Sequence, residues 1–288
     1  MSIKNTCVRV KLSLGKQSAY ITDKNITASV ESNFATHGRG KWTKRMFKDC
    51  VPFNKLQSSS TAISQMFNKE TLPWDDAWRV TKAANVMELA KKIEAANNRL
   101  KDDLTKFKAN YHNYVAEDIA ASKGMMKQDD YPDINEIEEK FYVKFKISPM
   151  PGAEDFRITE GLEQEEVDQL IEKAKADERE MLNRALQEPR QRLYKVVQHM
   201  KDRLTEYQGK EGDRLHKSVI ENVRDCIETL RKLNINDDAD LDNIMDELES
   251  SVLEDANIDR LKVIENERKE TVSKIDTIMD KMSFFGGK

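Results

Sequence analysis

Apolar positions recur along this chain at two spacings, one typical of strands and the other of helices. Residues 7–14 (CVRVKLSL) alternate apolar and polar side chains, which predicts a half-buried strand, and residues 18–22 are expected to return beside it. Helical spacing then runs from Pro52 to Phe67 and over residues 85–121. The pattern therefore predicts a small N-terminal β element followed by long helices.

The stretch FYVKFKISPMPGAEDFRIT, residues 141–159, interrupts the helical pattern. Its first half alternates apolar and polar positions, and Pro149, Pro151 and Gly152 then turn the chain. Residues 155–158 can pair back as a second strand. We therefore expect a β-hairpin that forms the tip of two long helices running in opposite directions.

Helical spacing resumes after Thr159 and continues to Tyr207, and Pro189 is expected to kink or interrupt it. Three further helices are predicted between residues 215 and 282. The predicted fold class is mainly α: an elongated, coiled-coil-like helical bundle or long antiparallel helical hairpin with a β-hairpin tip and a small N-terminal β element. The expected divisions are 1–50 (β element and basic loop), 51–212 (helical hairpin with its tip) and 213–288 (C-terminal helices and tail).

Composition agrees with a helical protein. Of the 288 residues, 35% are charged, and only ten are Gly and six Pro, which argues against a loop-rich or all-β fold. The three cysteines are scattered, which is typical of a reducing compartment. The N-terminus has no apolar signal-peptide core, and no run approaches the length of a membrane span. We expect a soluble cytoplasmic protein, located in the host cytoplasm if a phage encodes it.

Charge is distributed unevenly. Residues 1–60 contain eleven Lys and Arg against three Asp and Glu, a net charge of +8, whereas the whole chain carries −4, so the remainder carries −12. This polarity is compatible with head-to-tail self-association, with an acidic partner, or with solubility alone. We therefore expect a homo-oligomer that weakens as salt is raised.

The basic loop HGRGKWTKRMFK, residues 37–48, suggests two kinds of site. GRGK lacks the full phosphate-loop pattern, so a nucleotide site is not favoured. Basic side chains around Trp42 are typical of surfaces that bind nucleic acid by stacking and charge, and nucleic-acid binding is the second functional hypothesis.

The acidic string DADLDNIMDELE, residues 238–249, has carboxylates at the spacing of a calcium loop. However, Asn243 stands where that loop requires glycine for its sharp turn. We therefore interpret the string as the acidic first turn of an amphipathic helix, and we predict no metal and no cofactor.

No catalytic motif emerges from the rest of the chain, since there is no G-x-S-x-G turn and the four histidines are far apart. We assign no catalytic residue and predict that the protein is not an enzyme. A membrane-active, pore-type protein is the third hypothesis, because such proteins also place a β element between long helices. Its predicted tip carries five charged residues, which argues against insertion.

Several segments resemble a domain-of-unknown-function family of phages and bacteria. They are CVRVKLSLGKQSAYIT, FNKL…ISQMFNKETLPW, the Tyr131, Pro132, Phe141, Phe145 pattern, and LHKSVIENVRDCIETLRKLNINDDADLDNIMDEL. Members tend to be encoded beside MoxR-type AAA+ ATPases and cobaltochelatase-like proteins with von Willebrand A domains. The resemblance implies a non-enzymatic partner or adaptor of such a machine. The aspartate-rich string and the FFGGK tail depart from the family pattern.

The preferred hypothesis is thus a scaffold or adaptor that oligomerises or docks protein partners, including an AAA+ ATPase. Docking is expected through the tip, the basic loop and the tail. The candidate contact residues are Phe141, Phe145, Met150 and Phe156 in the tip; Arg39, Lys41, Trp42, Lys44 and Arg45 in the basic loop; and Phe284 and Phe285 in the tail.

Overall fold

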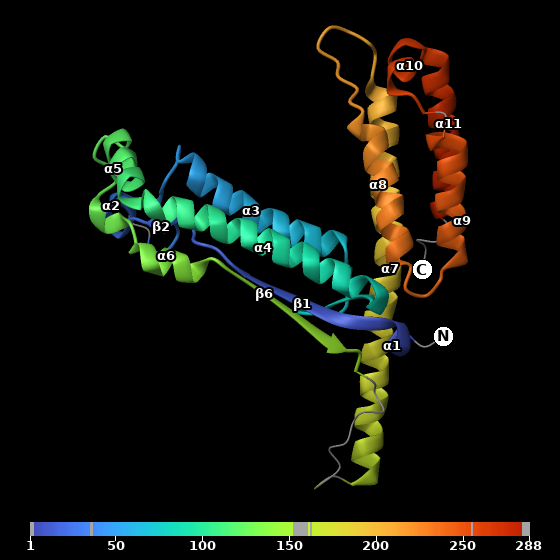
Figure 1. The fold of residues 1–288 in the computed structure, drawn as a ribbon, viewed down its shortest axis with the longest axis horizontal. Helices are drawn as coiled ribbons and strands as arrows, with labels where there is room; N and C mark the ends of the chain where they lie inside the picture. Colours follow the sequence, from blue (N-terminus) through green and yellow to red (C-terminus); the bar gives the residue numbers. More distant parts are fainter. Residues whose placement is uncertain (1–2, 35–36, 152–160, 162, 255, 284–288) are drawn as a thin grey trace. The chain divides into compact units, whose positions relative to one another are not determined.

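The computed structural model describes residues 3–34, 37–151, 161, 163–254 and 256–283, and helices predominate among them (Figure 1). The strands are β1 Cys7–Gly15, β2 Tyr20–Thr22, β3 Thr43–Arg45, β4 Leu72–Pro73, β5 Arg79–Lys82 and β6 Tyr142–Pro149. The helices are α1 Ile3–Thr6, α2 Lys24–Asn33, α3 Val51–Lys69, α4 Val86–Ala109, α5 Tyr111–Ala121, α6 Ile134–Lys140, α7 Gln164–Glu206, α8 Ser218–Leu233, α9 Ala239–Leu248, α10 Ile258–Val263 and α11 Glu265–Ser283. Short 3-10 turns lie at η1 Ala83–Asn85 and η2 Gln128–Asp130, and a π-helical turn at η4 Glu249–Leu253. Among these described helices, none has the length and apolar character that crossing a bilayer requires.

The chain divides into two compact units, each with its own core. Unit 1 comprises Met1–Lys11, Asn68–Met87 and Ile147–Lys288, and unit 2 comprises Leu12–Phe67 and Glu88–Lys146. The elements β1, α3, α4 and β6 begin in one unit and end in the other. Because the chain crosses between the units several times, cuts at residues 50 and 212 do not correspond to these units.

The strands pair differently from the N-terminal hairpin predicted by the sequence. β1 pairs antiparallel with β5, with Cys7 opposite Lys82, and the four-stranded sheet has the order β4-β5-β1-β6. The predicted return strand forms as β2, but it pairs with β3, with Tyr20 opposite Arg45. The segment between β1 and β2 offers no two-residue hairpin turn, so each strand finds a partner distant in sequence.

The strand predicted at the tip is present as β6, and its neighbour in the sheet is β1. The described part of the tip is therefore a strand of the four-stranded sheet, next to β1. The second predicted strand falls on residues 152–160, which lie outside the described residues.

The core of unit 2 is aromatic. Phe47 lies at its centre, with ring centroids 4.8 Å from Phe53, 5.5 Å from Phe107 and 5.1 Å from Tyr131. Phe47 has a positive φ of 53°, a strained backbone conformation for a bulky residue. Asp118 holds this turn in place, because its Oδ2 accepts hydrogen bonds from the Phe47 N–H and the Tyr131 hydroxyl, both at 2.6 Å. Burial and that hydrogen bond raise the pKa of Tyr131.

Helix α7 is the longest element of unit 1, and its apolar face packs along α8 and α11 (Figure 1). Its 43 residues continue through Pro189, which is buried, so the predicted break does not occur. The helix predicted over residues 85–121 is instead divided at Asn110, whose backbone leaves the helical conformation between α4 and α5.

The expected pairing of the two longest helices with each other is not confirmed. α4 contributes Leu100, Leu104 and Phe107 to the core of unit 2, together with residues of α3. α7 contributes its apolar residues to the core of unit 1. Each helix thus packs within a different unit.

The acidic string folds as the sequence predicted. Asp238 is the N-cap of α9, and its side chain accepts from the Leu241 N–H at 3.2 Å. Leu241, Ile244 and Leu248 are buried on one face. Arg190 donates two hydrogen bonds to Asp238, so this carboxylate is an anchor between α7 and α9.

Candidate docking surfaces

The local fold of α2 explains why part of its apolar side is exposed. Asp23 caps the helix by accepting hydrogen bonds from the N–H groups of Asn25 and Ile26, which fixes where α2 begins. Ile26, Val30 and Phe34 recur every four residues and form one stripe. Ile26 is half-buried, whereas Val30 is 44% and Phe34 74% exposed. The stripe therefore becomes more exposed toward the C-terminal end of α2.

The basic loop is fastened to α2 by three hydrogen bonds. The Trp42 N–H donates to the Thr27 Oγ1 at 2.9 Å, and the Trp42 carbonyl accepts from the Asp23 N–H at 2.9 Å. The Gly38 N–H donates to Glu31 at 2.6 Å. These contacts hold the loop against the helix, so Trp42 lies beside the exposed end of the apolar stripe.

Helix and loop together enclose a shallow hollow of about 300 Å³. We define the α2 surface by five of its lining residues: Val30, Phe34, Arg39, Lys41 and Trp42. Trp42 is 44% exposed, and both cations are exposed. Within the described residues, neither Arg39 nor Lys41 forms an ion pair. The surface therefore combines apolar side chains with two cations that form no ion pair within the described residues.

Lys44 occupies a different position from the other basic residues of the loop. Its side chain is 5% exposed, and its Nζ lies 2.6 Å from Asp130 and 3.0 Å from Asp23. Burial alone would lower the pKa of Lys44, but hydrogen bonds to the two carboxylates outweigh it and raise the pKa. Lys44 is thus used inside the fold, and we leave it out of the α2 surface. Its neighbour Arg45 is exposed and reaches Asn54 at 3.3 Å.

The apolar candidates of the tip are also largely used by the cores. Phe141 is 8% exposed in the core of unit 2, and Met150 is 8% exposed in a cluster of unit 1. Phe145 is half-buried, and its ring meets Phe67 edge-on at 6.3 Å. Phe141 and Met150 flank β6, and within β6 half-buried positions alternate with exposed ones over residues 142–146. The fold itself therefore covers much of the apolar surface that the hypothesis assigns to a partner. The remaining candidates, Phe156, Phe284 and Phe285, lie outside the described residues.

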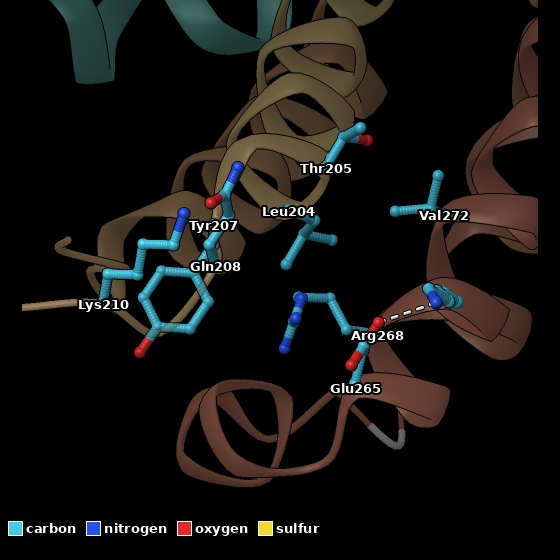
Figure 2. A pocket seen from close by; sticks show the side chains of 9 residues that line it. Leu204, Thr205, Tyr207, Gln208, Lys210, Glu265, Arg268 and Val272 are labelled. Carbon is cyan, nitrogen blue, oxygen red and sulfur yellow. Dashed lines mark ion pairs between the residues drawn. The ribbon is translucent and has the colours of Figure 1, made fainter.

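A second hollow, of about 440 Å³, lies between the C-terminal end of α7 and the first half of α11 (Figure 2). We call it the α11 hollow; its lining includes Leu204, Tyr207, Lys210, Glu265, Arg268, Lys269 and Val272. Figure 2 shows the Arg268 side chain extending toward Tyr207, and the guanidinium carbon lies 5.3 Å from the ring centroid. Arg268 also donates to the Leu261 carbonyl at 2.9 Å, so two contacts orient it.

Sequence reasoning missed the α11 hollow. The hollow joins residues about sixty positions apart, and each segment alone looks like an ordinary charged helix end. Next to the hollow, at the junction of α10 and α11, two consecutive apolar residues are exposed: Val263 is 82% and Ile264 39% exposed. The chain leaves helical geometry at Ile264, between α10 and α11.

Neither surface resembles a metal centre. Across the described ranges, no group of three or more His, Cys, Asp or Glu side chains could hold a metal ion. Comparisons of the chain with protein-family models, with curated proteins and with solved structures found no match.

Proposed function

We propose that this protein is a non-enzymatic adaptor that binds an acidic partner protein through the α2 surface. The observation that carries the proposal is the exposure of Val30, Phe34 and Trp42 around one hollow. Burying one such side chain fully contributes roughly 1.5–3 kcal/mol, so covering the apolar stripe would provide a driving force for association. Aromatic residues and arginine are also enriched at the centres of protein interfaces.

The charge of the α2 surface supports an acidic partner. Glu31 lines the same hollow, but its carboxylate accepts the hydrogen bond from Gly38. Arg39 and Lys41 outnumber this single carboxylate, so the lining keeps a net positive charge that a partner's carboxylates would complement. The family resemblance implies a MoxR-type AAA+ ATPase or a von Willebrand A-domain protein as the first partners to test.

The proposal is tested with a charge reversal and a matched control. Arg39→Glu combined with Lys41→Glu reverses the α2 surface, and Arg99→Glu combined with Lys101→Glu reverses two exposed cations on α4. The probe is a fluorescein-labelled peptide in which one phenylalanine is flanked by three aspartates on each side. Its binding is measured by fluorescence polarisation. We expect the first pair to weaken binding at least tenfold and the control pair to leave it unchanged. Equal effects of the two pairs would contradict the proposal.

Nucleic-acid binding is the second candidate, because the exposed ring of Trp42 lies beside two unpaired cations in the described structure. A labelled single-stranded thymidine oligonucleotide tests it under the same conditions. Binding that falls steeply with salt and disappears in Trp42→Ala would favour this function. Binding of the peptide without binding of the oligonucleotide would favour the adaptor function.

Self-association is the third outcome of the same experiments. We propose a homo-oligomer in which the basic surface of one copy meets acidic side chains of another. Light scattering at low and high salt measures its mass, and the Arg39→Glu and Lys41→Glu pair should lower that mass at low salt. A monomer under both conditions would remove self-assembly from the proposed function.

A further inference from the structure

The α11 hollow has kinds of side chains similar to those of the hollow at the α2 surface, although the two belong to different units. Each lining contains a valine, an arginine and a single glutamate, together with aromatic and lysine side chains: Phe34, Trp42 and Lys41 in one, and Tyr207, Lys210 and Lys269 in the other. In each, the glutamate is already engaged: Glu31 accepts from Gly38, and Glu265 lies 2.7 Å from Lys269. The net character that remains is apolar and positive in both places.

One carboxylate near the α11 hollow is used within the fold. Asp213 accepts hydrogen bonds from the N–H groups of Gln208 and Lys210, and so it shapes the loop that follows α7. Within the described residues, Lys210 has no ion pair. Arg268 uses one N–H for the Leu261 carbonyl, and the rest of its guanidinium faces the hollow beside Tyr207 (Figure 2).

Apolar surface is available at the same place. Leu204, Tyr207 and Val272 line the α11 hollow. Val263 and Ile264 are exposed and directly precede Glu265, which also lines the hollow. Val263 is the most exposed large apolar side chain among the described residues, at 82%. Consecutive exposed apolar residues next to a hollow are typical of surfaces that a partner covers.

We propose that the α11 hollow is a second docking site, which binds a partner segment carrying an apolar side chain next to carboxylates. The apolar side chain would cover Val263 and enter between Tyr207 and Val272. A carboxylate would pair with Lys210 and Arg268, and the guanidinium can offer two parallel N–H groups to it. The inference rests on the proposed function only for the class of partner, since its residues and its unit are separate.

Two sites of one specificity would let a partner with two acidic segments bind with avidity. Linking two modest interactions converts the second into an intramolecular step and strengthens the whole by orders of magnitude. The protein would then favour acidic partners that are dimeric or that repeat the segment.

Titration of the aspartate–phenylalanine peptide into the full chain, followed by isothermal calorimetry, tests the inference. We expect two peptides per chain, and one in the Arg39→Glu and Lys41→Glu pair. Lys210→Glu should weaken the remaining site about tenfold, and Val263→Ser should weaken it without unfolding because that side chain is exposed. Lys195→Glu, an exposed position on α7, is the matched control.

The outcomes for the two sites are distinguishable. Binding that is lost only on reversing Arg39 and Lys41 would overturn the α11 site and leave the proposed function intact. Binding that is lost only in Lys210→Glu would support the α11 site and overturn the proposed role of the α2 surface. No binding of the peptide at millimolar concentration would overturn both.

Discussion

Replacing Lys44 with methionine separates a structural role of this lysine from the partner-binding role that the sequence suggested. The side chain is 5% exposed, and its Nζ bridges Asp23 and Asp130 at 3.0 and 2.6 Å. Methionine fills much of the same volume but leaves two carboxylates close together without their cation. Removing one partner of a fully buried ion pair costs about 3–5 kcal/mol. Because the two carboxylates keep some contact with water, we expect Lys44→Met to lower the free energy of unfolding by roughly 2–3 kcal/mol.

The effect of Lys44→Met should depend on pH in a defined direction. Hydrogen bonds from the Ile26 N–H and from Lys44 hold the pKa of Asp23 below its ordinary value of 3.8. The stabilisation from Asp23 is therefore present above that value and is lost as pH falls through the lower, folded-state pKa. The raised pKa of Lys44 keeps its contribution present below about pH 10.5. The difference between wild type and variant should be full at pH 7 and should shrink toward pH 3.

Urea unfolding followed by far-UV circular dichroism measures both effects. Arg45→Met is the matched control, because Arg45 is the next residue of β3, is exposed and makes one long hydrogen bond to Asn54. We expect the control to change the free energy of unfolding by no more than about 0.5 kcal/mol. If Lys44→Met unfolds at the same urea concentration as Arg45→Met, the argument for a structural Lys44 is refuted.

Three further predictions follow from the packing. Phe107→Ala should lower the free energy of unfolding by about 3–5 kcal/mol in a urea titration, because the ring is fully buried among other aromatic rings. Gly15→Ala should cost roughly 2 kcal/mol in the same assay, because the added Cβ would lie 2.3 Å from the Lys140 carbonyl oxygen and from the Tyr142 ring. Burial raises the pKa of the Cys226 thiol to about 11, so iodoacetamide should modify Cys226 slowly at pH 8 in the native protein and rapidly in urea. Equal modification rates in the two conditions would contradict the last prediction.

Periodicity predicted individual elements well, because it reports which side chains are buried. The first strand appears at Cys7–Gly15, and α9, which Asp238 caps, buries the predicted residues. Pro189 illustrates the limit of local rules, since tertiary packing along α7 keeps the helix continuous through a residue that normally breaks one. Long-range pairing could not be read in the same way. Nothing in the local pattern of β1 specifies that β5, rather than β2, completes its hydrogen bonds.

The candidate contact residues also differ in how well the sequence predicted their exposure. Arg39, Lys41 and Trp42 were found because exposed charge and aromatic residues in a loop are visible in composition. Phe141 and Met150 were assigned to a partner because the sequence pattern of an apolar side chain is the same whether its own core or another protein covers it. The carboxylate that neutralises Lys44 most closely lies 86 residues away, so only the folded chain brings the two together.

Internal pairing also changes what the N-terminal charge means. Counted along the sequence, residues 1–60 carry +8, but several of these cations are bound by acids from elsewhere in the chain. Lys4 pairs with Glu178, Lys44 with Asp130 and Lys55 with Asp103. A charge that is already paired adds little to the attraction of a partner, because the field of the pair falls off faster than that of a single ion. Fewer cations are therefore left to attract a partner than the sequence suggests, and the two cations of the α2 surface are among them. Charge reversal of Arg39 and Lys41 should accordingly weaken partner binding strongly, and charge reversal of the exposed Lys55 should weaken it little. Net charge alone does not predict this contrast.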